Sequence, residues 1–218
     1  MIRYQRRYWL LAAGMSAVAG FVDAIAFVQL GGFFVSFMSG NSTRLGVGLA
    51  GALPQAALAA SLIAAFVAGV VLGAFINRNA DERGGPRVLV AVAALLALAA
   101  ALASLDAEAL AIALLAVAMG AENAVFHRDG EVSIGVTYMT GTLVKLGQRL
   151  AAALRGGEAW AWLPYFLLWL GLALGAACGA AAFSQLGLDS IWIAAAAAAL
   201  LAVVMGRVVR MSPRSDAP

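Results

Sequence analysis

The stretch Phe37-Met-Ser-Gly-Asn-Ser-Thr-Arg-Leu-Gly46 decides the fold of this chain, because it returns 101 residues later as Tyr138-Met-Thr-Gly-Thr-Leu-Val-Lys-Leu-Gly147. The similarity extends upstream, where Gly20-Phe-Val-Asp23-Ala corresponds to Gly120-Ala-Glu-Asn123-Ala. It also extends downstream, where a Gly-x-x-x-Gly pair at 69 and 73 corresponds to one at 171 and 175. The offset grows from 100 to 102 residues along the way, as single-residue insertions would make it. We therefore interpret the chain as an internal duplication.

The composition indicates a membrane protein. Apolar residues make up 64% of the chain and charged residues only 11%, with a mean hydropathy of +0.94, whereas soluble domains contain roughly 25% charged residues. The charges gather in short clusters between long apolar runs, which is the pattern of loops between membrane spans. Basic residues do not alternate with aromatic ones on any polar segment, so no nucleic-acid partner is expected. The composition predicts an all-α polytopic protein whose main partner is the lipid bilayer.

Crossing about 30 Å of hydrocarbon requires about 20 apolar residues per helix. Two stretches, 33–50 and 134–153, contain the repeated motif and each combines a cation with a Ser/Thr/Gly cluster, so they either span the membrane or dip in and return. We expect a first repeat over 1–105, a second over 106–211, and a disordered tail over 212–218. The sequence predicts six further spans, at about 8–29, 54–77, 87–105, 107–127, 160–184 and 189–210.

The distribution of Lys and Arg favours one of these two topologies, because basic loops remain in the cytoplasm. If both motif segments re-enter, the basic clusters at the N-terminus, at 78–87 and at 207–214 all lie inside, together with both termini. Asp106, Glu108 and Asp189 then lie outside. Three spans per repeat is an odd number, so the repeats would be inverted. Eight full spans in parallel repeats is the alternative, which obeys the rule less well.

The motif residues suggest a site for a polar solute. Hydroxyls, an amide and glycines suit the capping of a helix N-terminus whose free N–H groups face an anion or another hydrogen-bond acceptor. The same small residues could instead let helices pack closely, as the Gly-x-x-x-Gly pairs do. The candidate substrate-binding residues are Asp23, Ser39, Gly40, Asn41, Thr43, Arg44, Asn123, Thr140, Gly141, Thr142 and Lys145.

Asp23 is the most informative single residue, because a carboxylate near the bilayer centre costs several kcal/mol of free energy unless it is paired, hydrated or protonated. Its repeat counterpart is Asn123, which Glu122 precedes. Arg44 is a candidate ion-pair partner for Asp23, and Lys145 for Glu122. A structural ion pair and a proton-titrating group coupled to transport both remain open for Asp23.

Three segments resemble the YoaK-like family of bacterial inner-membrane proteins: Gly20-Phe-Val-Asp23-Ala, Gly31-Gly-Phe-Phe-Val-Ser-Phe-Met-Ser-Gly-Asn41 and Thr43-Arg-Leu-Gly46. The resemblance covers essentially the whole chain. It implies a small multi-pass protein of the bacterial cytoplasmic membrane, in a family suspected of transporting small molecules.

Two functions follow as hypotheses. The first is a small-solute transporter or channel whose site lies at the membrane midplane between the repeats, for a polar or anionic metabolite. The second is a non-transporting scaffold or regulatory subunit, which suits a chain of 218 residues. A single histidine and a single cysteine leave too few parts for a nucleophilic triad or a histidine metal site. We therefore expect no enzyme activity, metal or cofactor, while the glycine faces also permit a homodimer.

Overall fold

The computed structural model describes residues 6–77, 84–128, 131–132, 135 and 137–211. The predicted tail at 212–218 and most of the basic loop at 78–87 lie outside the described residues. Apart from a pair of two-residue antiparallel strands, β1 (His127–Arg128) and β2 (Glu131–Val132), the described elements are helical. The helices are α1 (Arg6–Gln29), α2 (Met38–Leu49), α3 (Leu53–Ile76), α4 (Gly84–Ala103), α5 (Glu108–Glu122), α6 (Met139–Leu154), α7 (Leu163–Leu186), the short 3₁₀ helix η1 (Gly187–Ser190) and α8 (Ile191–Met211).

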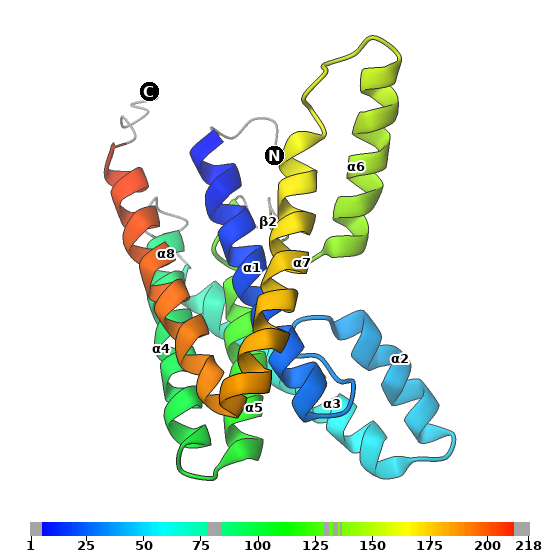
Figure 1. Cartoon of the computed structure of the whole chain (residues 1–218), viewed down its shortest axis with the longest axis vertical. Coiled ribbons are helices and arrows are strands. Elements are labelled where there is room, and N and C mark those ends of the chain that lie inside the picture. The colour runs from blue at the N-terminus through cyan, green and yellow to red at the C-terminus, as the bar shows by residue number, and fades with distance from the viewer. Residues whose placement is uncertain (1–5, 78–83, 129–130, 133–134, 136, 212–218) are drawn as a thin grey trace.

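Four segments of the described chain are long and apolar enough to cross a membrane: Tyr8–Gln29, Leu53–Ile76, Gly84–Ala103 and Leu163–Met211. The last comprises α7 and α8, which run in opposite directions from the bend at η1 (Figure 1). These helices contact the lipid bilayer, because buried backbone polar groups and apolar side chains together suit hydrocarbon. The predicted class, a helical polytopic membrane protein, agrees with this structure.

One predicted span is shorter than expected. The sequence suggested a helix over about 107–127, but α5 ends at Glu122 after 15 residues, or about 22 Å. The N–H groups of Asn123, Ala124 and Val125 each bond to the carbonyl three residues earlier, so the chain tightens into successive turns. The predicted boundary was wrong because the segment after Glu122 stays apolar and buried without staying α-helical.

Glycines bring two pairs of long helices into direct backbone contact. A Cβ atom at Gly69 or Gly73 would collide with the carbonyl oxygen of Val117 or Ala121, so α3 lies parallel to α5. The predicted role of the Gly-x-x-x-Gly pairs in close helix packing is thereby confirmed. In the same way α7 lies parallel to α1, where Gly171, Gly175 and Gly179 face the backbone of Ala13, Ala17 and Phe21 respectively.

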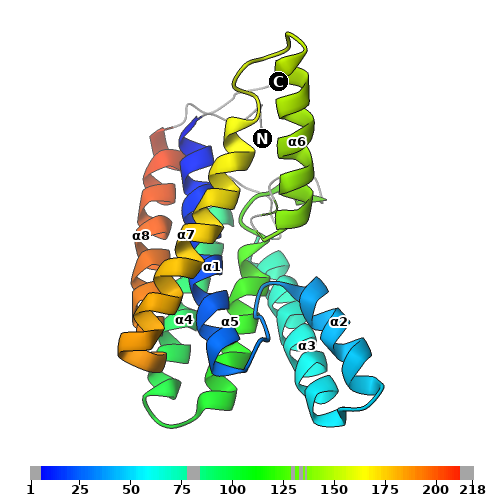
Figure 2. The same cartoon turned by 45° about the vertical axis from the view of Figure 1, so that its right-hand side comes forward.

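The helix contacts repeat under exchange of the two halves of the chain. The first helix of each half packs against the third helix of the other, α1 on α7 and α5 on α3. The fourth helices, α4 and α8, pack on each other. Gln29 at the end of α1 bonds to Glu108 at the start of α5 at 2.9 Å, so these two counterparts are antiparallel. Each helix of one half runs opposite to its counterpart in the other (Figures 1 and 2).

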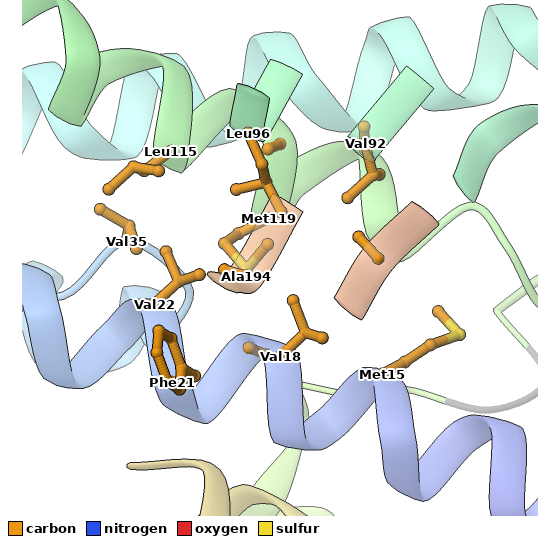
Figure 3. Close-up of a cluster of buried hydrophobic side chains, with 14 of the residues drawn as sticks. Met15, Val18, Phe21, Val22, Val35, Val92, Leu96, Leu115, Met119 and Ala194 are labelled. Atoms are coloured by element: carbon orange, nitrogen blue, oxygen red, sulfur yellow. The ribbon is translucent and has the colours of Figure 1, made fainter. Parts of the chain in front are cut away.

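The hydrophobic core lies where α1, α4, α5 and α8 meet. Figure 3 shows Val22 and Phe21 of α1 near Leu115 and Met119 of α5, with Val35 from the loop before α2 beside them. These side chains belong to one buried cluster, and their close packing stabilises the bundle. Helices α2 and α6 stand outside this cluster and each pack mainly on the following helix, α3 and α7.

Charged residues separate to the two ends of the bundle. The end that contains the α4–α5 turn and η1 has the acidic residues Asp106, Glu108 and Asp189. The opposite end contains the start of α1, the end of α8, the start of α4 and the end of α6, as Figure 1 shows. Basic residues occupy that second end, at Arg87, Arg155, Arg207 and Arg210.

Candidate functional site

The two copies of the motif form short helices that begin inside the molecule. Helix α2 has 12 residues and α6 has 16, so they extend about 18 and 24 Å. Both are too short to cross about 30 Å of hydrocarbon. They start near each other and run toward opposite ends of the bundle (Figure 2). Length alone does not distinguish them from α5, which has 15 residues; α2 and α6 differ from α5 in contributing no residue to the fully buried core and in packing mainly on the helix that follows each of them.

Asp23 fixes the loop that leads into α2. Its Oδ1 accepts hydrogen bonds from the backbone N–H groups of Val35 at 2.8 Å and Ser36 at 2.7 Å. Its Oδ2 accepts a third from the Ser36 hydroxyl. Three donors hold the loop firmly to the carboxylate, because hydrogen bonds to a charged acceptor are stronger than those between neutral groups. Asp23 therefore positions the backbone just before the motif helix.

Asn123 plays the equivalent part in the second half. Its Oδ1 accepts a hydrogen bond from the Thr137 hydroxyl at 3.0 Å, and its Nδ2 donates to the carbonyl of Met119 at 3.0 Å. Thr137 stands 101 residues after Ser36, so the two hydroxyl contacts are counterparts. Both halves thus tie a motif helix to the helix that precedes it through one polar side chain.

Asn41 closes the first loop from the other side. It is fully buried, and its side chain makes two hydrogen bonds with the backbone of Phe34, accepting from N–H at 3.1 Å and donating to the carbonyl at 2.6 Å. Its counterpart Thr142 is also buried, with 7% of its surface exposed. Both residues support the shape of the loop and helix start rather than presenting groups to a solute.

A single cavity of about 250 Å³ lies between the two motif segments. Equivalent positions from both halves line it, so the repeats contribute to one shared space. Among the described lining residues, only Phe66, from α3, comes from outside the motif segments. The lining residues are Ser36, Phe37, Met38, Ser39, Phe66, Thr137, Tyr138, Met139, Thr140 and Gly141.

Both helix N-termini at this cavity lack a side-chain cap. The predicted capping by the motif hydroxyls was wrong, since the helices begin at Met38 and Met139, before or within the hydroxyl cluster. The hydroxyls of Ser42 and Thr43 instead donate to carbonyls one turn earlier. Within the described residues, the N–H groups in the first turn at Ser39 and Thr140 have no hydrogen-bond partner. Such free amides, with the positive end of the helix dipole, favour an anion or another acceptor.

The two motif cations do not reach this cavity. The guanidinium of Arg44 lies 4.8 Å from the centre of the Phe33 ring. Arg44 lines a separate cavity of about 260 Å³ with Phe33, Thr43, Val47 and Gln55. Lys145 is exposed on α6. The suggested ion pair between Asp23 and Arg44 was therefore wrong, because Ser36 and Val35 occupy the carboxylate and the aromatic ring holds the cation.

The predicted site residues thus divide into distinct groups. Ser39, Thr140 and Gly141 line the shared cavity, with Gly40 adjacent. Asp23, Asn41 and Asn123 support its walls, and Thr142 is buried behind it. Thr43 and Arg44 line the second cavity. Across the described residues, no three His, Cys, Asp or Glu side chains gather in a way that would hold a metal ion.

The sequence analysis missed several lining residues, above all Ser36 and Thr137. Their signal was present in the repeat, because both positions carry a hydroxyl at an offset of 101 residues, two positions before the motif helices begin. Phe37 and Tyr138 show the same conserved aromatic character between the halves. Comparing the halves one position at a time would have found all four.

The long apolar helices of this fold define an integral membrane protein. A family model described as "Protein of unknown function (DUF1275)" matches residues 11–204, and the chain belongs to this family. It is also 35% identical to the UPF0700 transmembrane protein RA0705 of Rhizobium meliloti (strain 1021), over 92% of this chain and 87% of that protein. No solved structure matches the chain. The family is an uncharacterised membrane family, as the sequence resemblance implied, while the narrower YoaK-like assignment stays a prediction.

Proposed function

We propose that this protein is a small-solute transporter or channel whose site is the cavity between the two motif segments. The observation that carries the proposal is the lining: Ser36, Ser39, Thr137 and Thr140 come from equivalent positions of the two halves and face one space. Paired polar interruptions at the interface of membrane repeats are typical of solute sites in transporters.

The proposed arrangement in the membrane is six spans with two re-entrant half-helices, α2 and α6, in inverted repeats. The antiparallel counterparts and the exchange of first and third helices between halves support it. Irregular backbone such as the loop before α2 is stable at membrane depth only where protein buries it or a watery cavity meets it. The loop satisfies this condition through the contacts of Asp23 and Asn41.

The charge distribution supports an orientation. Under the positive-inside rule the end with Arg87, Arg155, Arg207 and Arg210 faces the cytoplasm, and the start of α1 and the end of α8 lie at that end. The proposed location is therefore the bacterial cytoplasmic membrane, with both termini inside.

The chemistry of the cavity favours a small polar or anionic solute. Hydroxyl groups and free backbone amides from two helix N-termini converge there. Its volume of about 250 Å³ lies below the roughly 300–1,000 Å³ of pockets for drug-sized ligands. Phe37, Phe66 and Tyr138 provide apolar walls, so the solute has both a polar and an apolar side.

The test combines ligand-dependent thermal stabilisation in detergent with solute uptake into proteoliposomes, using a panel of small anions and polar metabolites. Thr140→Trp fills the cavity and should abolish both signals while the protein still folds. Gly147→Trp is the matched control, because Gly147 lies on the same helix with no other residue near its Cβ position. Absence of any stabilising solute or flux, with a stoichiometric protein partner on purification, would favour the non-transporting subunit instead.

A further inference from the structure

Glu122 is a buried carboxyl group to which the proposed site gives no role. It is the last residue of α5 and only 1% of its surface is exposed. Among the described residues, its Oε2 has no hydrogen-bond partner. The equivalent position in the first half, 100 residues earlier, is Val22, which is fully buried in the apolar core. Packing at this position therefore does not require a carboxyl group.

Among the described residues, the surroundings of Glu122 offer little compensation for a negative charge. Helices α1, α3 and α4 pack against α5. Helix α1 contributes Asp23, whose like charge acts on Glu122. Helix α3 has no acidic or basic residue, and the charged residue of α4, Arg87, is exposed. A carboxylate left unpaired in such a place costs several kcal/mol, so burial favours the neutral carboxylic acid.

A second unpartnered oxygen lies at the same end of the α3–α5 pair. The side chain of Asn77, just after α3, donates to the carbonyl of Ala124 at 2.7 Å, while its Oδ1 has no partner among the described residues. Asn77 is 5% exposed. The end of the α3–α5 pair therefore contains two buried acceptor oxygens without donors, within a contact that is otherwise apolar.

The cavity is connected to Glu122 through Thr137 and Asn123. Thr137 lines the cavity and donates to Asn123, which directly follows Glu122 in the chain. A solute that displaces Thr137 therefore breaks one of the contacts at the end of α5, where Asn77 also bonds to the carbonyl of Ala124. Opening of that end would let water reach the Glu122 carboxyl.

We infer that Glu122 is the proton-carrying residue that couples solute passage to proton movement across the membrane, an inference that rests on the proposed transport function. In the closed arrangement the carboxyl holds its proton on Oε2. When the end of α5 opens, the O–H bond breaks, the proton passes to water, and the electron pair stays on the carboxylate. Rebinding a proton from the other face restores the neutral group, so each cycle moves one proton.

The first arm of the test needs no solute, because its probe is the proton. Infrared spectra of the full-length protein in nanodiscs are recorded over a pH series for wild type, Glu122→Gln and Glu108→Gln. We expect a carboxylic-acid carbonyl band that disappears on alkaline titration in wild type and Glu108→Gln, and that is missing in Glu122→Gln. Glu108 is the matched control, since it lies on the same helix and its Oε2 accepts from Gln29 near the surface. A band of undiminished intensity in Glu122→Gln would overturn the inference, whereas a residual band that Asp23→Asn removes belongs to that other buried carboxyl group.

The second arm uses a solute identified by the uptake screen. An imposed proton gradient should drive its accumulation in wild-type proteoliposomes, and Glu122→Gln should lose that accumulation while keeping solute exchange without a gradient. Wild-type uptake that ignores the gradient would overturn the coupling while leaving the transport function intact. Absence of any uptake by wild type would instead overturn the transport function and the coupling with it, while the infrared arm still decides whether Glu122 holds a proton.

Discussion

Thr137 donates a hydrogen bond to Asn123 across 3.0 Å, and Ser36 makes the equivalent contact to Asp23 in the first half of the chain. Each pair joins the residue at the end of one helix or within it to a hydroxyl that lines the shared cavity. The same relationship has thus survived in both halves with different polar partners, an amide and a carboxylate. It makes these four residues the connection between the cavity and the long helices.

Two substitutions of Asp23 distinguish the contribution of its hydrogen-bond geometry from that of its negative charge. Asp23→Ala leaves the N–H groups of Val35 and Ser36 without their acceptor, so we expect a loss of about 3 kcal/mol in stability. Asp23→Asn retains one acceptor oxygen and the shape of the side chain, so it should cost less than half as much. Thermal unfolding in detergent compares the two. Equal losses would mean that the charge of Asp23, rather than its geometry, holds the loop.

The glycine contacts predict a large difference between two substitutions. Gly175→Val places a Cβ against the carbonyl of Ala17 in the α1–α7 contact, and we expect a loss of more than about 3 kcal/mol or failure to fold. Gly206→Ala on α8 meets no atom within 4 Å and should gain up to about 1 kcal/mol from helix propensity. Expression level and melting temperature in detergent are the measurements. Wild-type stability of Gly175→Val would show that α1 and α7 do not touch as described.

The two motif cations should behave differently despite their equivalent positions. Arg44→Gln removes the contact with the Phe33 ring, worth about 1 kcal/mol, and the positive charge of the second cavity. We expect a small fall in melting temperature and no change in solute binding, because Arg44 lies outside the shared cavity. Lys145→Gln, which removes an exposed charge, should change neither. Matching effects for the two variants would contradict the separate environments of these cations.

The cavity hydroxyls should matter for binding more than for folding. Ser36→Ala and Thr137→Ala each remove from the wall a hydroxyl oxygen that can accept a hydrogen bond from the solute while its proton is donated to Asp23 or Asn123, so we expect about tenfold weaker solute binding for each, as a lost hydrogen bond predicts. Thr137→Ser keeps the hydroxyl and should bind like wild type. Isothermal titration with the solute found in the uptake screen measures the affinities. A Thr137→Ser variant as weak as Thr137→Ala would assign the effect to packing of the methyl group.

Much of the fold could be predicted because long runs of apolar residues identify membrane helices. Long apolar runs gave the positions of α1, α3, α4, α7 and α8, and the repeat gave α2 and α6. The early end of α5 could not be predicted, since Ala124, Val125 and Phe126 are as apolar as a continuing helix. What ends the helix there is a set of tight turns, and turns leave little trace in hydropathy.

The candidate site was harder to predict than the fold. Ser39 and Thr140 were found from the motif, but the partners of Asp23 were not, because Ser36 lies 13 residues away along an irregular loop. Helical periodicity carries no information about such a loop. Arg44 was expected near Asp23 on charge alone, whereas the Phe33 ring holds it in a different cavity.

The most direct test of the inverted arrangement is sided labelling of two single cysteines in intact cells, in a Cys178→Ala background. Gly51→Cys lies in the turn after α2 and Glu158→Cys in the turn after α6, and both positions are exposed. The account predicts that a membrane-impermeant maleimide labels Gly51→Cys from outside, while Glu158→Cys reacts only after permeabilisation. Labelling of both from the same side would contradict inverted repeats and, with them, a shared cavity built from two opposed half-helices.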